Sequence, residues 1–427
     1  MNVPARLVAC ALAGSLAGVP AWAQPTTSPP VGPTATATAS ADAASSAVVS
    51  LRTAFDAAWQ RAVAAREADG QRRRADVERT SAARLWAAPP TLELSHRDDR
   101  LHGNAGRRET EIALAVPLWL PGQRAARAGT ADAAAAQAQA AEQVARLRLA
   151  GELREAAWQL AGLQADVAQA DAQALSLRQL ADDVQRRVRA GDLARADSLA
   201  AQAEHLAATA AVADARQRLL SARARWTLLT GLTAWPDLPG AAIPVAAALD
   251  VAGHPEWQWA SQSTELAQRR LDLVRHARRD APELTLGLRQ DMPGRGEAAQ
   301  GSLVVGLRLP FGTDDRNQPR EAAALSELDI AQTHAQRLRE RLDSDIAAAR
   351  ASLQSAQTQH DAETARARLL RERAALIDTS FRAGETPLPD LLRALAAAAQ
   401  ADSAVARQTA ALGLARARLH QALGLLP

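Results

Sequence analysis

The sequence contains no tyrosine and no lysine, and aromatic residues make up only 3% of its 427 positions. A large rounded core usually draws on bulky rings, whereas long helices packed through Ala and Leu need few of them. The scarcity of aromatic residues therefore favours long packed helices over the two or three globular domains that the length alone would suggest.

Because lysine and tyrosine are missing, almost no side chain titrates between neutral pH and the pKa of arginine. The isoelectric point near 10.3 therefore reflects arginine usage, while the net charge is only +3. Acidic and basic residues are interspersed along the chain, which leaves no concentrated basic patch. Nucleic acid is not a predicted partner.

The chain has a single cysteine, Cys10, and it lies in an amino-terminal leader. Arg6 precedes an apolar run from Leu7 to Val19, and an A-x-A pattern ends at Ala23, so residues 1–23 are predicted to be a secretory signal peptide. The run is too short to span a bilayer. The residues before Cys10 superficially resemble a lipoprotein site, but too little apolar chain precedes it, and we expect a mature chain without thiols.

Motifs for catalysis are also missing. The sequence has no H-E-x-x-H, G-x-S-x-G, Walker loop or dinucleotide fingerprint. Its 8 histidines are scattered, with no pair at ligand spacing on one helix, and its Asp pairs are typical of solvated charges rather than calcium ligands. We therefore predict neither an enzyme nor a bound metal or cofactor.

An internal duplication organises the rest of the chain. Arg189-Ala190-Gly191-Asp192 recurs as Arg382-Ala383-Gly384-Glu385, an offset of 193 (382 − 189), and Pro, Asp, Arg and Gly-Leu landmarks recur at the same offset. This period is far longer than that of a solenoid repeat. The predicted organisation is a signal peptide (1–23), a flexible Pro- and Thr-rich tether (24–50), a first repeat (51–232), a Pro-containing linker (233–253) and a second repeat (254–427).

Each repeat has the same predicted order: a helical segment (51–88; 254–280), a β-hairpin, a very long helix, a reversing turn and a returning helix. The hairpins follow from a period of two, with apolar residues that alternate with polar or small ones and predict half-buried strands joined by tips at 97–107 and 290–300. The alternating apolar residues are Leu92, Leu94, Ile112, Leu114, Val116, Leu118, Leu284, Leu286, Leu288, Leu303, Val305, Leu307 and Leu309.

The long helix of the first repeat shows apolar residues at steps of three and four, as in Leu149, Leu153, Leu160 and Leu177. This spacing predicts a coiled-coil seam. No proline interrupts residues 122–188, and such a helix would be about 100 Å long, weakened locally by Gly151 and Gly162. A helix of that length does not fit inside an ordinary globular domain.

Four alternating strands per chain cannot close a membrane barrel, because closed barrels begin at about eight strands. An open edge in lipid leaves backbone groups unpaired. Either the strands are not membrane strands, or several chains share one barrel. Two chains would supply eight strands and three would supply twelve, and only the wider barrel leaves an appreciable pore.

The duplicated strand-strand-helix unit, and an R-A-G-[D/E] turn with Asp six residues after its Gly, resemble the TolC-like outer membrane efflux proteins. The resemblance covers about residues 51–427. It implies a mainly α fold with a β-barrel contribution: a homotrimer whose twelve strands form one outer-membrane barrel and whose helices continue as a hollow α-barrel across the periplasm. It also implies two partners, a periplasmic adaptor and an inner-membrane pump.

The same resemblance implies roles for the turn residues. Arg189, Ala190, Gly191, Arg382, Ala383 and Gly384 would lie at the periplasmic tip and contact the adaptor, although each glycine also serves simply to permit the turn. Asp390, with its counterpart Asp197, matches a carboxylate that rings the tip constriction in some members. Neighbouring Arg393 replaces a second acid, and the alternative for Asp390 is a helix N-cap.

The stretch from Pro117 to Arg124 resembles the heavy-metal (CzcC-like) branch, although its Pro and Gly residues also suit a strand end followed by a helix start. Trp86 and Trp119 suit an interfacial aromatic belt or isolated packing. We therefore expect a passive outer-membrane conduit of a Gram-negative cell with a large periplasmic part, which exports small solutes or heavy-metal cations. The alternative is a soluble periplasmic coiled-coil scaffold.

Overall fold

The computed structural model describes residues 48–101, 103–238, 251–311 and 314–427. The predicted signal peptide with Cys10, nearly all of the predicted tether, and much of the predicted linker lie outside these residues. Within the described residues the chain is mainly helical, with one four-stranded and one two-stranded sheet.

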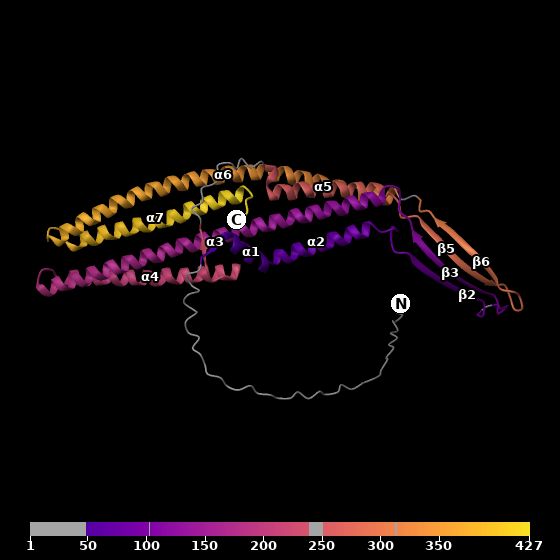
Figure 1. Ribbon diagram of the computed structural model, residues 1–427, viewed down its shortest axis with the longest axis horizontal. Helices are drawn as coiled ribbons and strands as arrows, with labels where there is room; N and C mark the ends of the chain where they lie inside the picture. The colour runs from indigo at the N-terminus through magenta and orange to yellow at the C-terminus, as the bar shows by residue number, and fades with distance from the viewer. Residues whose placement is uncertain (1–47, 102, 239–250, 312–313) are drawn as a thin grey trace, which may run out of the picture. The chain divides into compact units, whose positions relative to one another are not determined.

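Residues 51–230 and 255–422 follow the same order of elements, except that the first set opens with two helices and the second with one (Figure 1). The first set is α1 (Leu51–Arg61), α2 (Val63–Ala82), β2 (Thr91–Asp98), β3 (Arg108–Pro117), α3 (Gln123–Ala190) and α4 (Arg195–Thr230). The second set is α5 (Pro255–His276), β5 (Glu283–Met292), β6 (Gln300–Arg308), α6 (Asp314–Arg382) and α7 (Leu388–Ala422). The division into repeats at 232 and 254 stays a prediction.

The first helical segment is divided into two helices and ends earlier than predicted. It was predicted over 51–88, but the chain breaks at Ala62, whose backbone is extended (φ −67°, ψ 136°), and α2 ends at Ala82. No Gly or Pro marks this break. It follows from packing, because α1 turns its buried face, which includes Phe55, onto α3 and α4, and tertiary contacts override local helix propensity.

The two longest helices, α3 and α6, contain 68 and 69 residues and are each about 100 Å long. The predicted uninterrupted helix over 122–188 is confirmed. Its glycines do not break it. A Cβ on Gly162 would lie 3.2 Å from the Cβ of Ala410, so this glycine permits close packing against α7. No helix among the described residues has both the length and the apolar character needed to cross a membrane.

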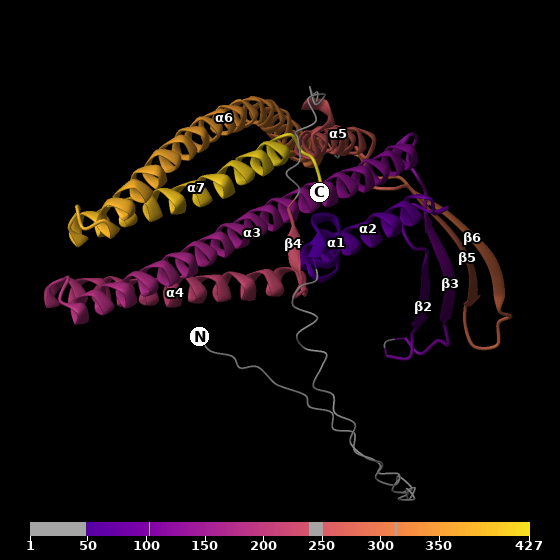
Figure 2. The same ribbon diagram turned by 60° about the vertical axis from the view of Figure 1, so that its left-hand side comes forward.

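The helices lie side by side, with α3 in the middle (Figures 1 and 2). Helices α2 and α4 contact one side of α3, while α5 and α7 contact the other side and pack in turn against α6. One edge of this layer is therefore formed by α2 and α4, and the opposite edge is formed by α6.

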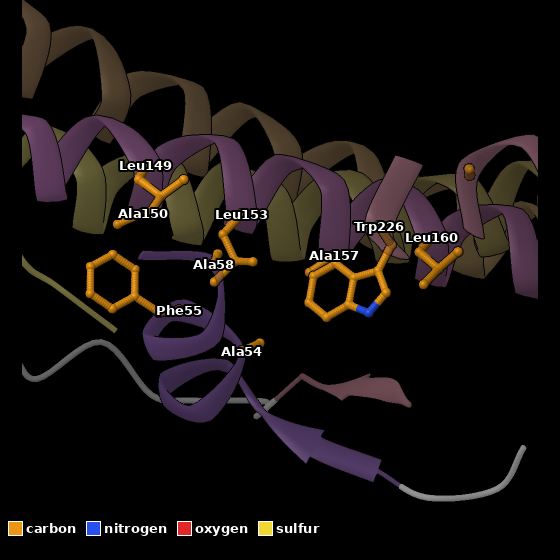
Figure 3. Packing of buried hydrophobic residues seen from close by; sticks show 10 residues of the cluster. Ala54, Phe55, Ala58, Leu149, Ala150, Leu153, Ala157, Leu160 and Trp226 are labelled. Carbon is orange, nitrogen blue, oxygen red and sulfur yellow. The ribbon is translucent and has the colours of Figure 1, made fainter. Parts of the chain in front are cut away.

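The largest described core lies where α1, α3 and α4 meet (Figure 3). Phe55, Leu153 and Trp226 are buried in it. The indole N–H of Trp226 donates to the carbonyl of Ala234 at 3.0 Å, directly before β4 (Trp235–Asp237), which pairs in parallel with β1 (Val48–Ser50). This core fixes the start of the folded chain against the end of α4.

A second anchor joins the end of α7 to α3. The guanidinium of Arg154, on α3, is buried and donates to Gln421 Oε1 and to the carbonyl of Leu425, both at 2.7 Å. Burial lowers the pKa of Arg154 to about 10. The amide of Gln421 donates in turn to the carbonyl of Leu147 at 2.8 Å. The last residues of the chain are thereby held by a helix of the first repeat.

The four long strands form one antiparallel sheet in the order β2-β3-β5-β6. The strands contain 8, 10, 10 and 9 residues, so the predicted hairpins are confirmed, with bounds within a few residues of those expected. Because β3 pairs with β5, the two hairpins form one sheet, and β2 and β6 are its edges.

Candidate functional site

One face of the four-stranded sheet is apolar from edge to edge. The register places Leu92, Leu114, Leu286 and Val305 in one row across the strands, and Leu94, Ile112, Leu288 and Leu303 in the next. The strands were predicted to be half-buried through their alternating apolar residues. This holds at the helix end of the face, where Val116 is only 6% exposed, but it is wrong for these two rows, in which Leu92 is 70% exposed and Leu303 is 71% exposed.

The opposite face is polar or small. One row contains Glu93, Ala113, Gly287 and Val304, and the next contains Ser95, Glu111, Arg289 and Ser302. Ala113 is only 3% exposed, and a Cβ built on Gly287 would lie 2.9 Å from the Ala113 Cβ, so the two strands approach each other too closely here for a larger residue than glycine. Arg289 contacts Glu109 at 2.9 Å and Asp291 at 3.8 Å. The sheet thus separates a hydrocarbon-like surface from a hydrated one.

Both edges of this sheet are open. Strand β2 pairs only with β3, and β6 pairs only with β5, among the residues described. Each edge strand therefore presents a row of backbone N–H and C=O groups that can pair with another strand. The open edges of the sheet lie on the same two sides as the edges of the helical layer, because β2 follows α2 and β6 precedes α6.

Aromatic side chains gather where the sheet meets the helices. Trp119, two residues past β3, donates from its indole N–H to the carbonyl of Arg84 at 3.3 Å, and the Arg127 guanidinium lies 5.7 Å from its ring centroid. Trp86 and Phe311 are exposed. The role of the two tryptophans in an interfacial belt stays a prediction.

The two predicted R-A-G turns reverse the chain between α3 and α4 and between α6 and α7. Gly191 has φ +92° and Gly384 has φ +81°, and no atom lies within 4 Å of a Cβ built on either. The amide of Asp192 donates to the carbonyl of Arg187 at 2.9 Å, and that of Glu385 donates to Ser380 at 3.0 Å. These glycines are needed for the left-handed backbone and not for close approach.

The remaining predicted tip residues are accessible. Arg189, Ala190, Arg382 and Ala383 are exposed at the ends of α3 and α6. Arg382 forms an ion pair with Asp378 one turn earlier, at 2.7 Å. The two turns therefore present similar surfaces of alanine, glycine and arginine.

The two predicted constriction residues occupy the third position of their helices but make different contacts. Asp197 accepts from the backbone N–H of Ala194 at 3.2 Å, which closes the first turn of α4. Asp390 was given an N-cap as its alternative role, and this was wrong: the N-cap of α7 is Pro387. Because proline has no N–H, Asp390 has no equivalent backbone partner, and it forms an ion pair with Arg393 instead.

The turns are held together by contacts that the sequence pattern did not indicate. Phe381 of α6 is buried among Val184 of α3, Ala201 of α4 and Leu391 of α7. The Arg187 guanidinium lies 5.1 Å from the Phe381 ring centroid and also contacts Asp183 at 3.1 Å. A helix-face arginine beside Val188 carries no sequence signal for this contact, since its partner lies on the other repeat.

Metal ligands are not gathered in the described part of the chain, where no group of three or more His, Cys, Asp or Glu residues is placed to hold an ion. Of the described histidines, His254 is buried and His420 is half-buried. His254 accepts from the backbone N–H of Glu256 through Nδ1 at 3.2 Å, and burial lowers its pKa, as it also does for His420.

This architecture is the fold of TolC-like outer-membrane channel subunits. Among solved structures, the chain is similar to the outer membrane protein VceC from Vibrio cholerae, with a TM-score of 0.72 and 16% identity over 88% of this chain and 96% of that chain. It is also similar to a membrane protein from Pseudomonas aeruginosa (TM-score 0.71, 19% identity, 94% and 97% covered). A third similar structure is that of CusC, described in connection with transmembrane channel formation. Its TM-score is 0.72 and its identity is 16%, over 89% of this chain and 94% of that chain.

No protein-family model and no curated protein matches the sequence. At these identities the likeness to solved structures is a likeness of fold. At that level the predicted resemblance to TolC-like outer membrane efflux proteins is confirmed. The heavy-metal branch and the roles of the tip residues stay predictions.

Proposed function

We propose that this chain is one subunit of an outer-membrane efflux channel. The observation that carries the proposal is the sheet, which combines an exposed apolar face, a polar face and two open edges. In water such a sheet would be prone to aggregation through its open edges and its apolar face. In a bilayer the apolar face contacts lipid, the polar face lines a water-filled passage, and another copy of the chain pairs with each edge.

The number of copies follows from the strands. One chain supplies four, and a head-to-tail contact between the β6 edge of one copy and the β2 edge of the next closes into a ring. Three copies give twelve strands, which is wide enough for a pore, whereas an eight-stranded barrel is filled by its own side chains. The homotrimer also joins α6 of each copy to the α2 and α4 side of its neighbour.

At the far end of the helices, the two R-A-G turns are the proposed contact with a periplasmic adaptor, through which the channel would serve an inner-membrane pump. Their support is the exposed, similar surface of both turns. Asp197 and Asp390 remain the proposed constriction, with one revision: Arg393 offsets the charge of Asp390 within the same chain, so any cation attraction there is weaker than that of a bare carboxylate.

The proposed cargo is small solutes, with heavy-metal cations as the more specific suggestion from the stretch between Pro117 and Arg124. A passive conduit needs no tight metal site. The matching experiment is a deletion strain tested for growth on divalent metals and on organic toxic compounds. Increased sensitivity to metals alone supports the metal branch, whereas sensitivity to organic compounds alone contradicts it.

Disulfide cross-linking tests the proposed trimer directly, because the only cysteine, Cys10, lies in the predicted signal peptide and its removal would leave a mature chain without cysteine. Ser302→Cys on the β6 edge is combined with single cysteines along β2. We expect at least one pair to yield covalent dimers and trimers, and nothing larger, in the outer-membrane fraction. Ser302→Cys with Glu111→Cys, on the interior strand β3, is the matched control and is expected not to cross-link.

Two results would contradict the channel. A ladder that stops at two chains would overturn the twelve-stranded barrel, and recovery of the mature chain in the soluble periplasm without any cross-link would favour the soluble coiled-coil scaffold instead.

A further inference from the structure

The apolar face of the sheet ends differently at its two ends. At the helix end lie Trp86, Trp119 and Phe311, and Phe311 is 78% exposed. At the hairpin end there is no such ring, since residues 91–117 and 283–308 contain no Trp, Tyr or Phe. Membrane barrels usually carry aromatic girdles at both interfaces. The hairpin end of this sheet therefore needs another means of meeting the headgroups.

Polar residues take the place of the missing girdle. On the strand positions that continue the apolar face, the row after Leu94 and Ile112 contains His96 and Thr110, and the row after that contains Asp98 and Arg108. His96 Nδ1 and Thr110 Oγ1 lie 2.9 Å apart, which leaves the other ring nitrogen of His96 free to face outward.

Arg108 is exposed and has no carboxylate partner among the described residues. The two nearest acids along the strands are already engaged. Asp98 contacts Arg100 Nε at 2.9 Å and accepts from the backbone N–H of Arg100 at 2.8 Å. Glu109 points to the polar face, where it pairs with Arg289. A guanidinium beside the apolar face is thus left without a counter-ion from the described part of the chain.

The hairpin tips around Arg108 are braced. Arg295, from the β5–β6 connection, donates to Asn104 Oδ1 at 2.8 Å, and its backbone N–H donates to the carbonyl of Ala105 at 3.0 Å. Asp99 accepts from the backbone N–H groups of Ala105 and Gly106. Residues 104–106, close to Arg108, are therefore fixed by hydrogen bonds.

The length of the apolar face places Arg108 at the level of the headgroups. The apolar positions run from Ile112 in β3 to Leu118, just past its end, and Arg108 lies four residues beyond Ile112. The ten residue steps from Leu118 to Arg108 extend over about 34 Å along the strand, which at a tilt of about 40° is about 26 Å in height, close to the roughly 25 Å lipid-facing band of a membrane barrel. A cation at the edge of the hydrocarbon is stabilised by an anion in the same layer, and guanidinium binds phosphate through two parallel hydrogen bonds.

We propose that the hairpin end of the sheet binds phosphorylated headgroups of outer-leaflet lipids, with Arg108 as the main phosphate ligand and His96 beside it. This inference rests on the proposed function, because it requires the sheet to lie in a membrane with its hairpins outward. It adds a lipid-recognition site that anchors one end of the barrel by charge, while the Trp and Phe residues anchor the other end by their rings.

The test uses the full mature chain reconstituted in phosphatidylcholine vesicles, with or without a fifth of the lipid replaced by phosphatidic acid, whose phosphate is exposed as a monoester. The readout is the melting temperature of the inserted oligomer. We expect phosphatidic acid to raise the melting temperature of the unmodified chain. Arg108→Gln should lose most of this rise, and Arg108→Lys should keep an intermediate part because it retains charge but not the two-pronged geometry.

Arg308→Gln is the matched control, since Arg308 is also an exposed strand arginine (83% exposed) but lies on the polar face at the other end of the sheet. It should keep the full rise. An equal rise in all variants, or no rise in an unmodified chain that inserts normally, would overturn the lipid site and leave the channel standing. Failure of the unmodified chain to insert in either vesicle would count against the channel itself.

Discussion

Gly191 and Gly384 show what single residues contribute at the tips. Both have a left-handed backbone in open space, so a valine there fits sterically with its surroundings but strains its own backbone, at a cost of at least about 1–2 kcal/mol. We expect Gly191→Val and Gly384→Val to abolish assembly with the adaptor while insertion of the sheet is kept. Co-purification of the adaptor and heat-resistant trimer on gels measure the two effects separately.

Gly296 supplies the control for this prediction. It has φ +88° and, like the tip glycines, no atom within 4 Å of a built Cβ, but it lies in the β5–β6 connection. Gly296→Val imposes the same kind of strain far from the tips and should leave adaptor binding unchanged. Normal export by both tip variants would argue against docking at the R-A-G turns.

His254 makes the start of α5 sensitive to pH. Its Nδ1 must be unprotonated to accept from the N–H of Glu256. Burial is the main cause of its lowered pKa, Glu256 acts in the opposite direction, and Arg341 lowers the pKa further. Because the folded pKa lies below the unfolded value near 6.5, the stabilisation is present above that pH and is lost as the pH falls through the folded pKa.

We therefore expect the melting temperature of the unmodified chain to fall more steeply between neutral and mildly acidic pH than that of His254→Asn, which keeps an N-cap acceptor without a titrating ring. His420, whose pKa is also lowered, contributes to both proteins and cancels in the comparison. Parallel pH profiles for the two proteins would contradict the assignment.

At the scale of elements, two helical glycines have opposite roles. A Cβ on Gly413 of α7 would lie 2.1 Å from the Trp158 ring on α3, whereas a Cβ on Gly70 of α2 would meet nothing within 4 Å. Gly413→Ala should lower the free energy of unfolding by about 1–3 kcal/mol through overpacking. Gly70→Ala should raise it by about 0.5–1 kcal/mol through lower backbone entropy in the unfolded chain.

Chemical denaturation of the two variants beside the unmodified chain measures this difference. If Gly413→Ala proves as stable as the unmodified chain, α3 and α7 are not held at the distance that the Trp158 contact requires. The comparison therefore reports on the contact between the two helical hairpins rather than on helix propensity, which the Gly70 variant isolates.

At the scale of the whole molecule, the two faces of the sheet predict opposite responses to charge. Leu303 and Ser302 are neighbours on β6 and both are exposed in the single chain, but they lie on opposite faces. In a membrane barrel, Leu303→Arg would bury a cation in lipid at a cost of about 2–4 kcal/mol near the bilayer midplane, whereas Ser302→Arg would face water. We expect only the first to reduce the amount of trimer in outer-membrane fractions.

A soluble scaffold would tolerate both substitutions equally, since both side chains would then face water. The two substitutions, at neighbouring positions of β6, therefore distinguish a sheet that lies in a membrane from one that lies in water.

Much of this architecture could be predicted from local patterns, and the failures have a common cause. The period of two around Leu286 and the absence of proline in 122–188 act over neighbouring residues, and they correctly indicated the hairpins and the long helix. The break at Ala62 depends on packing with distant helices. Arg154 is buried by partners at Gln421 and Leu425, from the other repeat, a contact that no local pattern reports.

The candidate site shows the same division. The alternation on the strands revealed an apolar face but not whether that face is covered within the chain. The position of Asp390 suggested a cap, yet the missing N–H of Pro387 directs its carboxylate to Arg393. The offset of 193 indicated that Asp197 and Asp390 occupy equivalent positions. Their contacts differ because the N-cap residue of the helix is Ala194 in the first case and Pro387 in the second.

For the proposed trimer, the open edges of the sheet also determine what happens to a subunit before assembly. A newly exported chain with β2 and β6 unpaired and leucines exposed offers any other extended polypeptide a template for pairing. We expect free subunits to be short-lived in the periplasm, either held by a chaperone or degraded. The supply of channels would then depend on how quickly three subunits meet at the membrane, and a modest drop in synthesis would reduce their number more than proportionally.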